Sequence, residues 1–209
     1  MQRRELLRSL STAALASAVP GIATAADAIK LKPIGKAQPF DYAWLKGQAR
    51  SMAGVAYLAP QHNLPAVLRE LDYDRYQTIR YRPDHALWAA DKLQFQVRLF
   101  HAGLFFNEPV HIYEVNGGIA QELAYDPALF DFGRSGVRGE RLPKDLGFAG
   151  FRVLFHTDPD RDVAAWLGAS YFRAVGGDWQ YGLSSRGLAI DTGLVKGEEF
   201  PRFTAFWLE

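Results

Sequence analysis

The sequence predicts a mainly β protein, an antiparallel β-sandwich preceded by two short helices. From residue 76 onward apolar and polar residues alternate, most clearly over 93–99, which is the pattern of a half-buried strand. Similar runs recur at short intervals without the strand–helix alternation of a doubly wound sheet, which favours a sandwich. The other runs cover residues 110–115, 119–125, 148–155, 171–175, 187–192 and 203–208.

Turn residues separate these runs. Asn116-Gly117-Gly118 lies between two of them and predicts a tight hairpin, because glycine accepts the positive φ angles that such turns need. We also expect turns at 158–160, 176–178 and 196–198, which combine Asp, Pro, Gly and Lys. The last run reaches almost to Glu209, so we expect the sandwich to be incomplete within this chain.

The N-terminal part divides into three segments. Residues 1–25 have the basic start, Ala-rich stretch and small-residue end of a secretory signal, and Arg3-Arg4 before Leu6-Leu7 resembles a twin-arginine signal. Its apolar stretch is too short and interrupted to span a membrane. Residues 26–39 lack periodicity and are expected to be a tether. Residues 40–75 are expected to hold the two helices, over 42–58 and 64–71, and residues 76–209 the truncated sandwich.

Composition argues against several functions. The chain has 24 Lys and Arg against 23 Asp and Glu, so its net charge offers no attraction to nucleic acid. It has no cysteine, which excludes disulfides, thiolate metal sites and cysteine nucleophiles. Its five histidines lack the spacing of a metal site, and we predict neither a metal nor another cofactor.

The densest cluster of aromatic and arginine side chains lies within residues 171–186. Aromatic rings stack on sugar rings, and guanidinium groups donate hydrogen bonds to hydroxyls, so this composition suits a carbohydrate ligand. The same residues could instead be core aromatics and surface arginines. We assign no catalytic residue, because spacing does not pair the carboxylates. The candidate substrate-binding residues are Tyr171, Arg173, Trp179, Tyr181 and Arg186.

Several phrases, in order along the chain, resemble the glucans biosynthesis proteins of the OpgG/OpgD (MdoG) family, and the twin-arginine-like start favours the D type. The phrases are YQTIRYRP at 76–83, FHAG at 100–103, DLGFAGFR at 145–152, LGASYFRA at 167–174, YGLSSRGLAIDT at 181–192 and EEFPRFTAFW at 198–207. The resemblance implies a periplasmic protein that takes part in the biosynthesis of osmoregulated periplasmic glucans with a β-1,2-linked glucose backbone. It also implies that members resemble endo-β-1,2-glucanases, with the catalytic acid outside this chain, and that a smaller immunoglobulin-like domain follows the sandwich.

Three functions follow as alternatives. The first is a periplasmic protein that binds or processes a β-glucan oligosaccharide or polysaccharide, with enzymatic activity left open. The second is a non-catalytic scaffold whose partner is the glucan synthesis machinery. The third, a cofactor-bearing redox protein, is disfavoured because the chain lacks cysteine, glycine-rich nucleotide loops and metal-spaced histidines.

Overall fold

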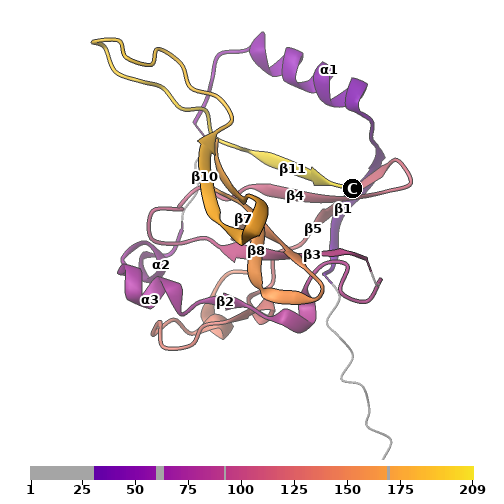
Figure 1. The fold of residues 1–209 in the computed structure, drawn as a ribbon, viewed down its shortest axis with the longest axis vertical. Coiled ribbons are helices and arrows are strands. Elements are labelled where there is room, and N and C mark those ends of the chain that lie inside the picture. Colours follow the sequence, from indigo (N-terminus) through magenta and orange to yellow (C-terminus); the bar gives the residue numbers. More distant parts are fainter. Residues whose placement is uncertain (1–30, 60–63, 92, 169) are drawn as a thin grey trace, which may run out of the picture.

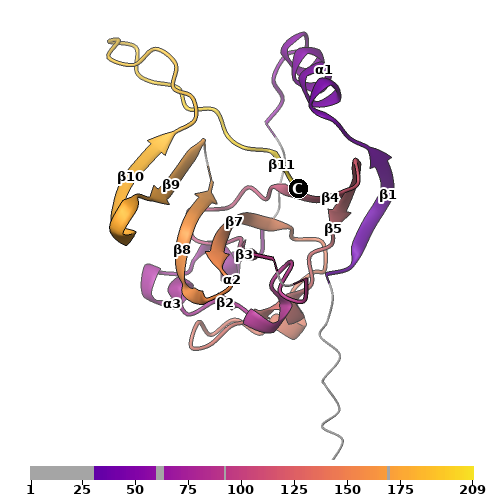
Figure 2. The same cartoon turned by 45° about the vertical axis from the view of Figure 1, so that its right-hand side comes forward.

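The structure is a computed structural model that describes residues 31–59, 64–91, 93–168 and 170–209, with the backbone alone described at 179 and 181–183. Most of its regular structure lies in two sheets (Figure 1). One sheet has five strands in the order β10-β9-β8-β7-β3, and the other has four in the order β1-β5-β4-β11. Figure 2 shows the two sheets on different sides of the molecule, with the chain passing between them several times.

The five-stranded sheet is antiparallel throughout. One face of the sheet is turned to the core and the other away from it. On the edge strand, Val97 and Leu99 are 1% and 2% exposed and lie on the core face, whereas Arg98 between them lies on the other face. The strands are β3 (Phe95–His101), β7 (Phe148–Phe155), β8 (Asp158–Leu167), β9 (Tyr171–Val175) and β10 (Tyr181–Arg186).

The four-stranded sheet contains β1 (Pro33–Pro39), β4 (His111–Asn116), β5 (Ile119–Leu123) and β11 (Ala205–Leu208). The predicted hairpin at Asn116-Gly117-Gly118 is confirmed, because β4 and β5 pair antiparallel and both glycines have positive φ, 58° and 76°. Strand β11 pairs with β4 in the parallel sense. The chain therefore returns to this sheet from the far end of the sequence.

One apolar core joins the two sheets. The rings of Phe151 on β7 and Phe206 on β11 meet edge to face at 5.0 Å, and a bridge links Val110 to Phe148. Fully buried Ile112 and Leu68 extend the core to β4 and to α2 (Ala66–Arg69). The core also takes in the short pair β2 (Arg80–Tyr81) and β6 (Phe130–Asp131). The mainly β class and the antiparallel sheets predicted from the sequence are confirmed.

The helices are short. Asp41 caps α1 (Tyr42–Ala53) by accepting a hydrogen bond from the Trp44 amide at 2.6 Å. Helix α3 (Tyr73–Gln77) follows α2, and single turns of 3₁₀ helix lie at η1 (Pro83–His85), η2 (Pro127–Leu129), η3 (Gly139–Arg141) and η4 (Gly177–Trp179). Across the described ranges no helix combines the length and apolar character needed to cross a membrane.

The N-terminal part differs from the sequence prediction in a strand and in the extent of its helices. Residues 33–39, expected within a tether, form β1, which pairs with the edge of β5 through backbone hydrogen bonds. Six of its seven residues are exposed, so the sequence lacks the alternation of apolar residues that would predict this strand. The helices therefore do not precede every strand. The helix expected over 42–58 ends at Ala53, the one expected over 64–71 is limited to α2, and α3 follows as a third helix. The first five residues of the segment expected as a tether lie outside the described residues.

Two expectations in the C-terminal half are also corrected. Residues 158–160 begin β8 instead of forming a turn, because the β7–β8 hairpin turns at His156 and Thr157. Residues 187–192 form no strand apart from a single bridge between Ile190 and Glu199. The strand that pairs with β9 is β10, over residues 181–186, because the turn at η4 brings these residues back beside β9.

Candidate functional site

A groove with a volume of about 1080 Å³ lies on the face of the five-stranded sheet that is turned away from the core. Its floor comes from β3, β7, β8 and β9. One wall is the segment from α3 through β2 to η1, and another is the loop over residues 104–106. A concave site of this size, built on a regular sheet, can hold an extended ligand against fixed side chains.

Strand register lines up arginines across the groove floor. Arg98 of β3 lies opposite Arg152 of β7, which lies opposite Ala165 of β8, and Ala165 lies opposite Arg173 of β9. Paired residues on neighbouring strands share one face of a sheet, about 4.8 Å apart per strand. The three guanidinium groups therefore belong to one row, with the small Ala165 leaving room between the second and the third.

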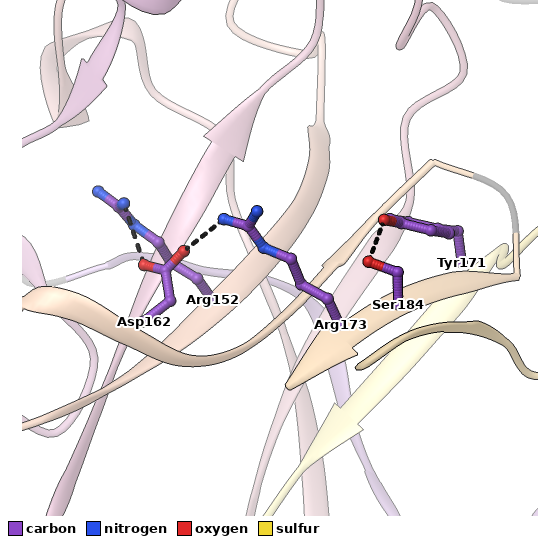
Figure 3. Close-up of polar contacts among 5 residues, drawn as sticks. All are labelled: Arg152, Asp162, Tyr171, Arg173 and Ser184. Atoms are coloured by element: carbon purple, nitrogen blue, oxygen red, sulfur yellow. Dashed lines mark hydrogen bonds and ion pairs between the residues drawn. The ribbon is translucent and has the colours of Figure 1, made fainter. Parts of the chain in front are cut away.

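Asp162 on β8 connects two members of this row. Its Oδ1 accepts a hydrogen bond from Arg152 Nη1 at 3.2 Å, and its Oδ2 lies 3.6 Å from Arg173 Nη2 (Figure 3). The Asp162 side chain is only 10% exposed. A register shift between Val153 and Leu154 sets Asp162 opposite Leu154, beside Arg152. Asp162 thus orients two arginines of the floor.

Arg98 has a different environment. It is 6% exposed and lines the groove, and its Nε atom is buried without a hydrogen-bond partner in the described part of the chain. Burial and the charge of Arg152 lower the pKa of Arg98, while Asp160 and Asp162 act in the opposite direction. The floor therefore contains a buried donor, Arg98 Nε, that none of the described residues satisfies.

Aromatic side chains border the groove. Phe105 in the loop is 80% exposed, Tyr73 at the start of α3 is 63% exposed, and Tyr171 on β9 is 38% exposed. Tyr76 also lines the groove and is half-buried, and its hydroxyl donates to the His101 carbonyl at 2.7 Å. Exposed rings around a polar floor are a surface on which apolar faces of a ligand can stack.

Two of the five predicted site residues lie in this groove. Tyr171 and Arg173 line it, and the Tyr171 hydroxyl donates to Ser184 Oγ at 2.7 Å across the β9–β10 pair (Figure 3). Arg186 is not among the lining residues, and its guanidinium lies 3.6 Å from the centre of the Phe200 ring. Trp179 and Tyr181 fall in η4 and at the start of β10, and their side chains lie outside what the structure describes.

Sequence reasoning missed several residues of the groove. The alternation over 93–99 placed Arg98 on the polar face of its strand, and the phrase DLGFAGFR ends in Arg152. The sequence did not place Asp162 on a strand, because residues 158–160 were predicted to form a turn. Only the strand register brings Arg98 and Arg152, far apart in the chain, into one row and sets Asp162 beside it.

The family model described as "Periplasmic glucan biosynthesis protein, MdoG" matches residues 40–209, and the chain belongs to this family. Its relatives include "Glucans biosynthesis protein D" of Xanthomonas campestris pv. campestris strain B100, 57% identical over 212 residues, and that of Xylella fastidiosa strain 9a5c, 54% identical over 213. Each alignment covers all of this chain and 40% of the relative. The chain thus spans about two fifths of the length of these curated relatives.

Proposed function

We propose that this chain is part of a periplasmic protein of glucan biosynthesis and that its groove binds the glucan. The observation that carries the proposal is the combination of exposed aromatic rings with a row of arginines and a carboxylate in one concave site. Membership of the family supports the glucan as the ligand. A glucose backbone with β-1,2 linkages is the ligand that the resemblance favours.

The chemistry of the groove suits a sugar chain. A pyranose ring has an apolar face of C–H groups, which packs on an aromatic ring such as Phe105 or Tyr73. Its hydroxyls accept hydrogen bonds from guanidinium groups and donate to carboxylates. Because Tyr73 on α3, Phe105 in the loop and Tyr171 on β9 come from different parts of the groove lining, a chain can contact several of them at once.

We assign binding, and no bond-breaking step, to these residues. Asp162 has each of its oxygens directed to an arginine, so it serves to position the floor. Tyr171 and Arg173 are the members of the predicted cluster that we place against the glucan. Trp179, Tyr181 and Arg186 remain candidates for continuing the contact along β10.

Removing an exposed ring from the rim is expected to weaken glucan binding. In the complete protein, Phe105→Ala or Tyr73→Ala should each lower the affinity for a linear β-1,2-glucan oligomer roughly 2- to 13-fold, since one ring contact contributes about 0.5–1.5 kcal/mol. Isothermal titration calorimetry measures this loss. Tyr57→Ala is the matched control, because Tyr57 is 77% exposed and does not line the groove. Unchanged affinity in both rim variants would refute the proposal.

We also propose that the protein reaches the periplasm through a twin-arginine signal in residues 1–25, which lie outside the described residues. The support is Arg3-Arg4 followed by Leu6-Leu7. Changing both arginines to lysine is expected to abolish export of a folded fluorescent reporter fused to this segment, as fractionation of the periplasm would show. Arg8→Lys, which keeps the pair, should leave export intact. Continued export of the reporter by the Lys-Lys variant would contradict the proposal.

A further inference from the structure

Helix α1 is poorly covered by the rest of the described chain. None of its residues is buried, and in Figures 1 and 2 it lies apart from both sheets. Trp44 attaches it to the body, because the Trp44 ring meets Phe40 and Trp207 edge to face, each at 5.8 Å. A helix of this length is marginal in water unless one of its faces is packed. Most of the surface of α1 is therefore available to a partner.

The surface of α1 and of the segment that follows it is rich in apolar and aromatic side chains. Leu45, Ala49 and Met52 recur at steps of four and three residues, so they lie on one side of the helix. Large side chains over 42–58 that are each at least 63% exposed are Tyr42, Met52, Val55, Tyr57 and Leu58. So many exposed apolar side chains in one short segment indicate an interaction surface.

Positive charge accompanies these residues. The whole chain is nearly neutral, with 24 Lys and Arg against 23 Asp and Glu, but residues 32–58 contain four cations and one carboxylate. The carboxylate, Asp41, caps α1. On the neighbouring strand β5, Glu122 lies opposite Ile34 and pairs with His111. The exposed cations are Lys32, Lys36, Lys46 and Arg50. The segment therefore favours an anionic partner.

The cations on α1 lie next to its apolar side. Lys46 and Arg50 are four residues apart and so occupy neighbouring turns of one side of the helix. Lys46 Nζ lies 5.1 Å from the centre of the Tyr42 ring, and both residues are exposed. Tyrosine, with an apolar ring and a polar hydroxyl, suits the boundary between water and lipid. An apolar side flanked by cations and tyrosines is typical of a helix that lies in the surface of a membrane.

We propose that α1 and residues 54–58 dock on the surface of a bilayer that contains anionic lipids. The apolar side chains enter the boundary between headgroups and acyl chains, and Lys46 and Arg50 lie against the lipid phosphates. Both kinds of side chain find partners there at once, because the phosphates lie directly above the acyl chains. The docking needs no glucan and goes beyond the function proposed for the groove.

Sedimentation of the complete protein with lipid vesicles tests this docking. We expect binding to vesicles of phosphatidylglycerol, little binding to vesicles of phosphatidylcholine, and weaker binding to the former when salt is added. Lys46→Gln together with Arg50→Gln should lower the partition coefficient roughly 30-fold, because each cation contributes about a factor of five near an anionic surface. Leu58→Ser should lower it roughly 10-fold through the loss of an inserted apolar side chain.

Arg134→Gln together with Arg138→Gln is the matched control, because it removes the same charge from exposed positions. Both arginines follow β6, which pairs with β2 at the opposite end of the molecule from α1 (Figure 1). The Debye length is about 8 Å at physiological salt, so these distant charges are screened and lipid binding should stay within about twofold of the wild type. Neither pair of residues lines the groove, so both double variants should keep the affinity of the wild type for the glucan oligomer.

Equal binding of the wild type to both kinds of vesicle, or to neither, would overturn the proposal, and this comparison needs no variant to fold. Hydrogen exchange of the α1 amides distinguishes lipid from other occupants. Exchange that slows only when phosphatidylglycerol vesicles are present would support the docking. Equally slow exchange without vesicles would show that the complete protein or a second copy already covers α1, and would overturn it. An equal loss of lipid binding in the Arg134 and Arg138 control would also overturn it, because net charge alone would then explain the binding.

Discussion

Gly150→Ala is expected to destabilise the fold by about 4 kcal/mol or more, because it places atoms where backbone already lies. Gly150 lies on β7 opposite Leu167 of β8, with φ of 149°. A methyl group added there would come within 2.1 Å of the Trp166 carbonyl oxygen and 3.0 Å of its carbonyl carbon. No side-chain rotation relieves a clash with backbone in the middle of a sheet. Urea unfolding of the complete protein measures the loss.

Gly193→Ala separates this clash from the strain of an unusual backbone angle. Gly193 also has a positive φ, 76°, but an added methyl group would meet nothing within 4 Å. We expect this variant to lose about 1 kcal/mol from backbone strain alone. Similar losses in the two variants would show that the close approach of β7 and β8 does not control stability.

Acidification from pH 6.5 to pH 4 is expected to remove about 3 kcal/mol of stability through His101. The residue is 3% exposed, and Nδ1 donates to the Ala102 carbonyl at 2.6 Å, which leaves Nε2 to accept from the Tyr125 hydroxyl at 2.7 Å. Burial lowers the pKa of His101 from 6.5 to about 4. Above pH 6.5 the ring is neutral in both states, so the stabilisation is complete. As the pH falls toward 4, only the unfolded chain gains the proton, and stability is lost.

The difference between wild type and His101→Gln isolates this effect from other titrating groups. Glutamine cannot take up a proton in this range, so the variant should lack the part of the pH dependence that His101 causes. His156→Gln, which removes an exposed histidine, should behave as the wild type does. The measurement is the free energy of unfolding of each variant at intervals between pH 7 and pH 4. The same pH dependence of this free energy in wild type and His101→Gln would contradict the prediction.

Alternation in the sequence identified strands that have one buried face. The runs at 148–155 and 171–175 coincide with β7, which has five buried residues, and with β9, whose Phe172 and Ala174 are half-buried on one side. Strand β1 could not be found this way, since it lies on an edge with both faces largely exposed. Strand β10 was placed six residues too late, because its residues alternate less clearly than those of 187–192 and only pairing with β9 positions it.

The candidate site was predictable only where it is local in sequence. Tyr171 and Arg173 are two residues apart on one strand, so composition alone brought them together. Arg98 and Arg152 are 54 positions apart and meet through register, a long-range property that no local pattern contains. The exposure of the Phe105 ring could not be predicted either, because the local sequence of a loop does not indicate whether a side chain is buried or exposed.

The bridge from Arg152 through Asp162 to Arg173 also affects the thermodynamics of ligand capture. A long side chain that is free before binding loses about 0.5–1.5 kcal/mol of conformational entropy when a ligand immobilises it. Asp162 imposes much of that ordering on two arginines during folding. Part of the groove floor is therefore already ordered before the ligand binds. The entropic cost of ordering these two arginines is part of the free energy of folding and does not reduce the free energy of ligand binding.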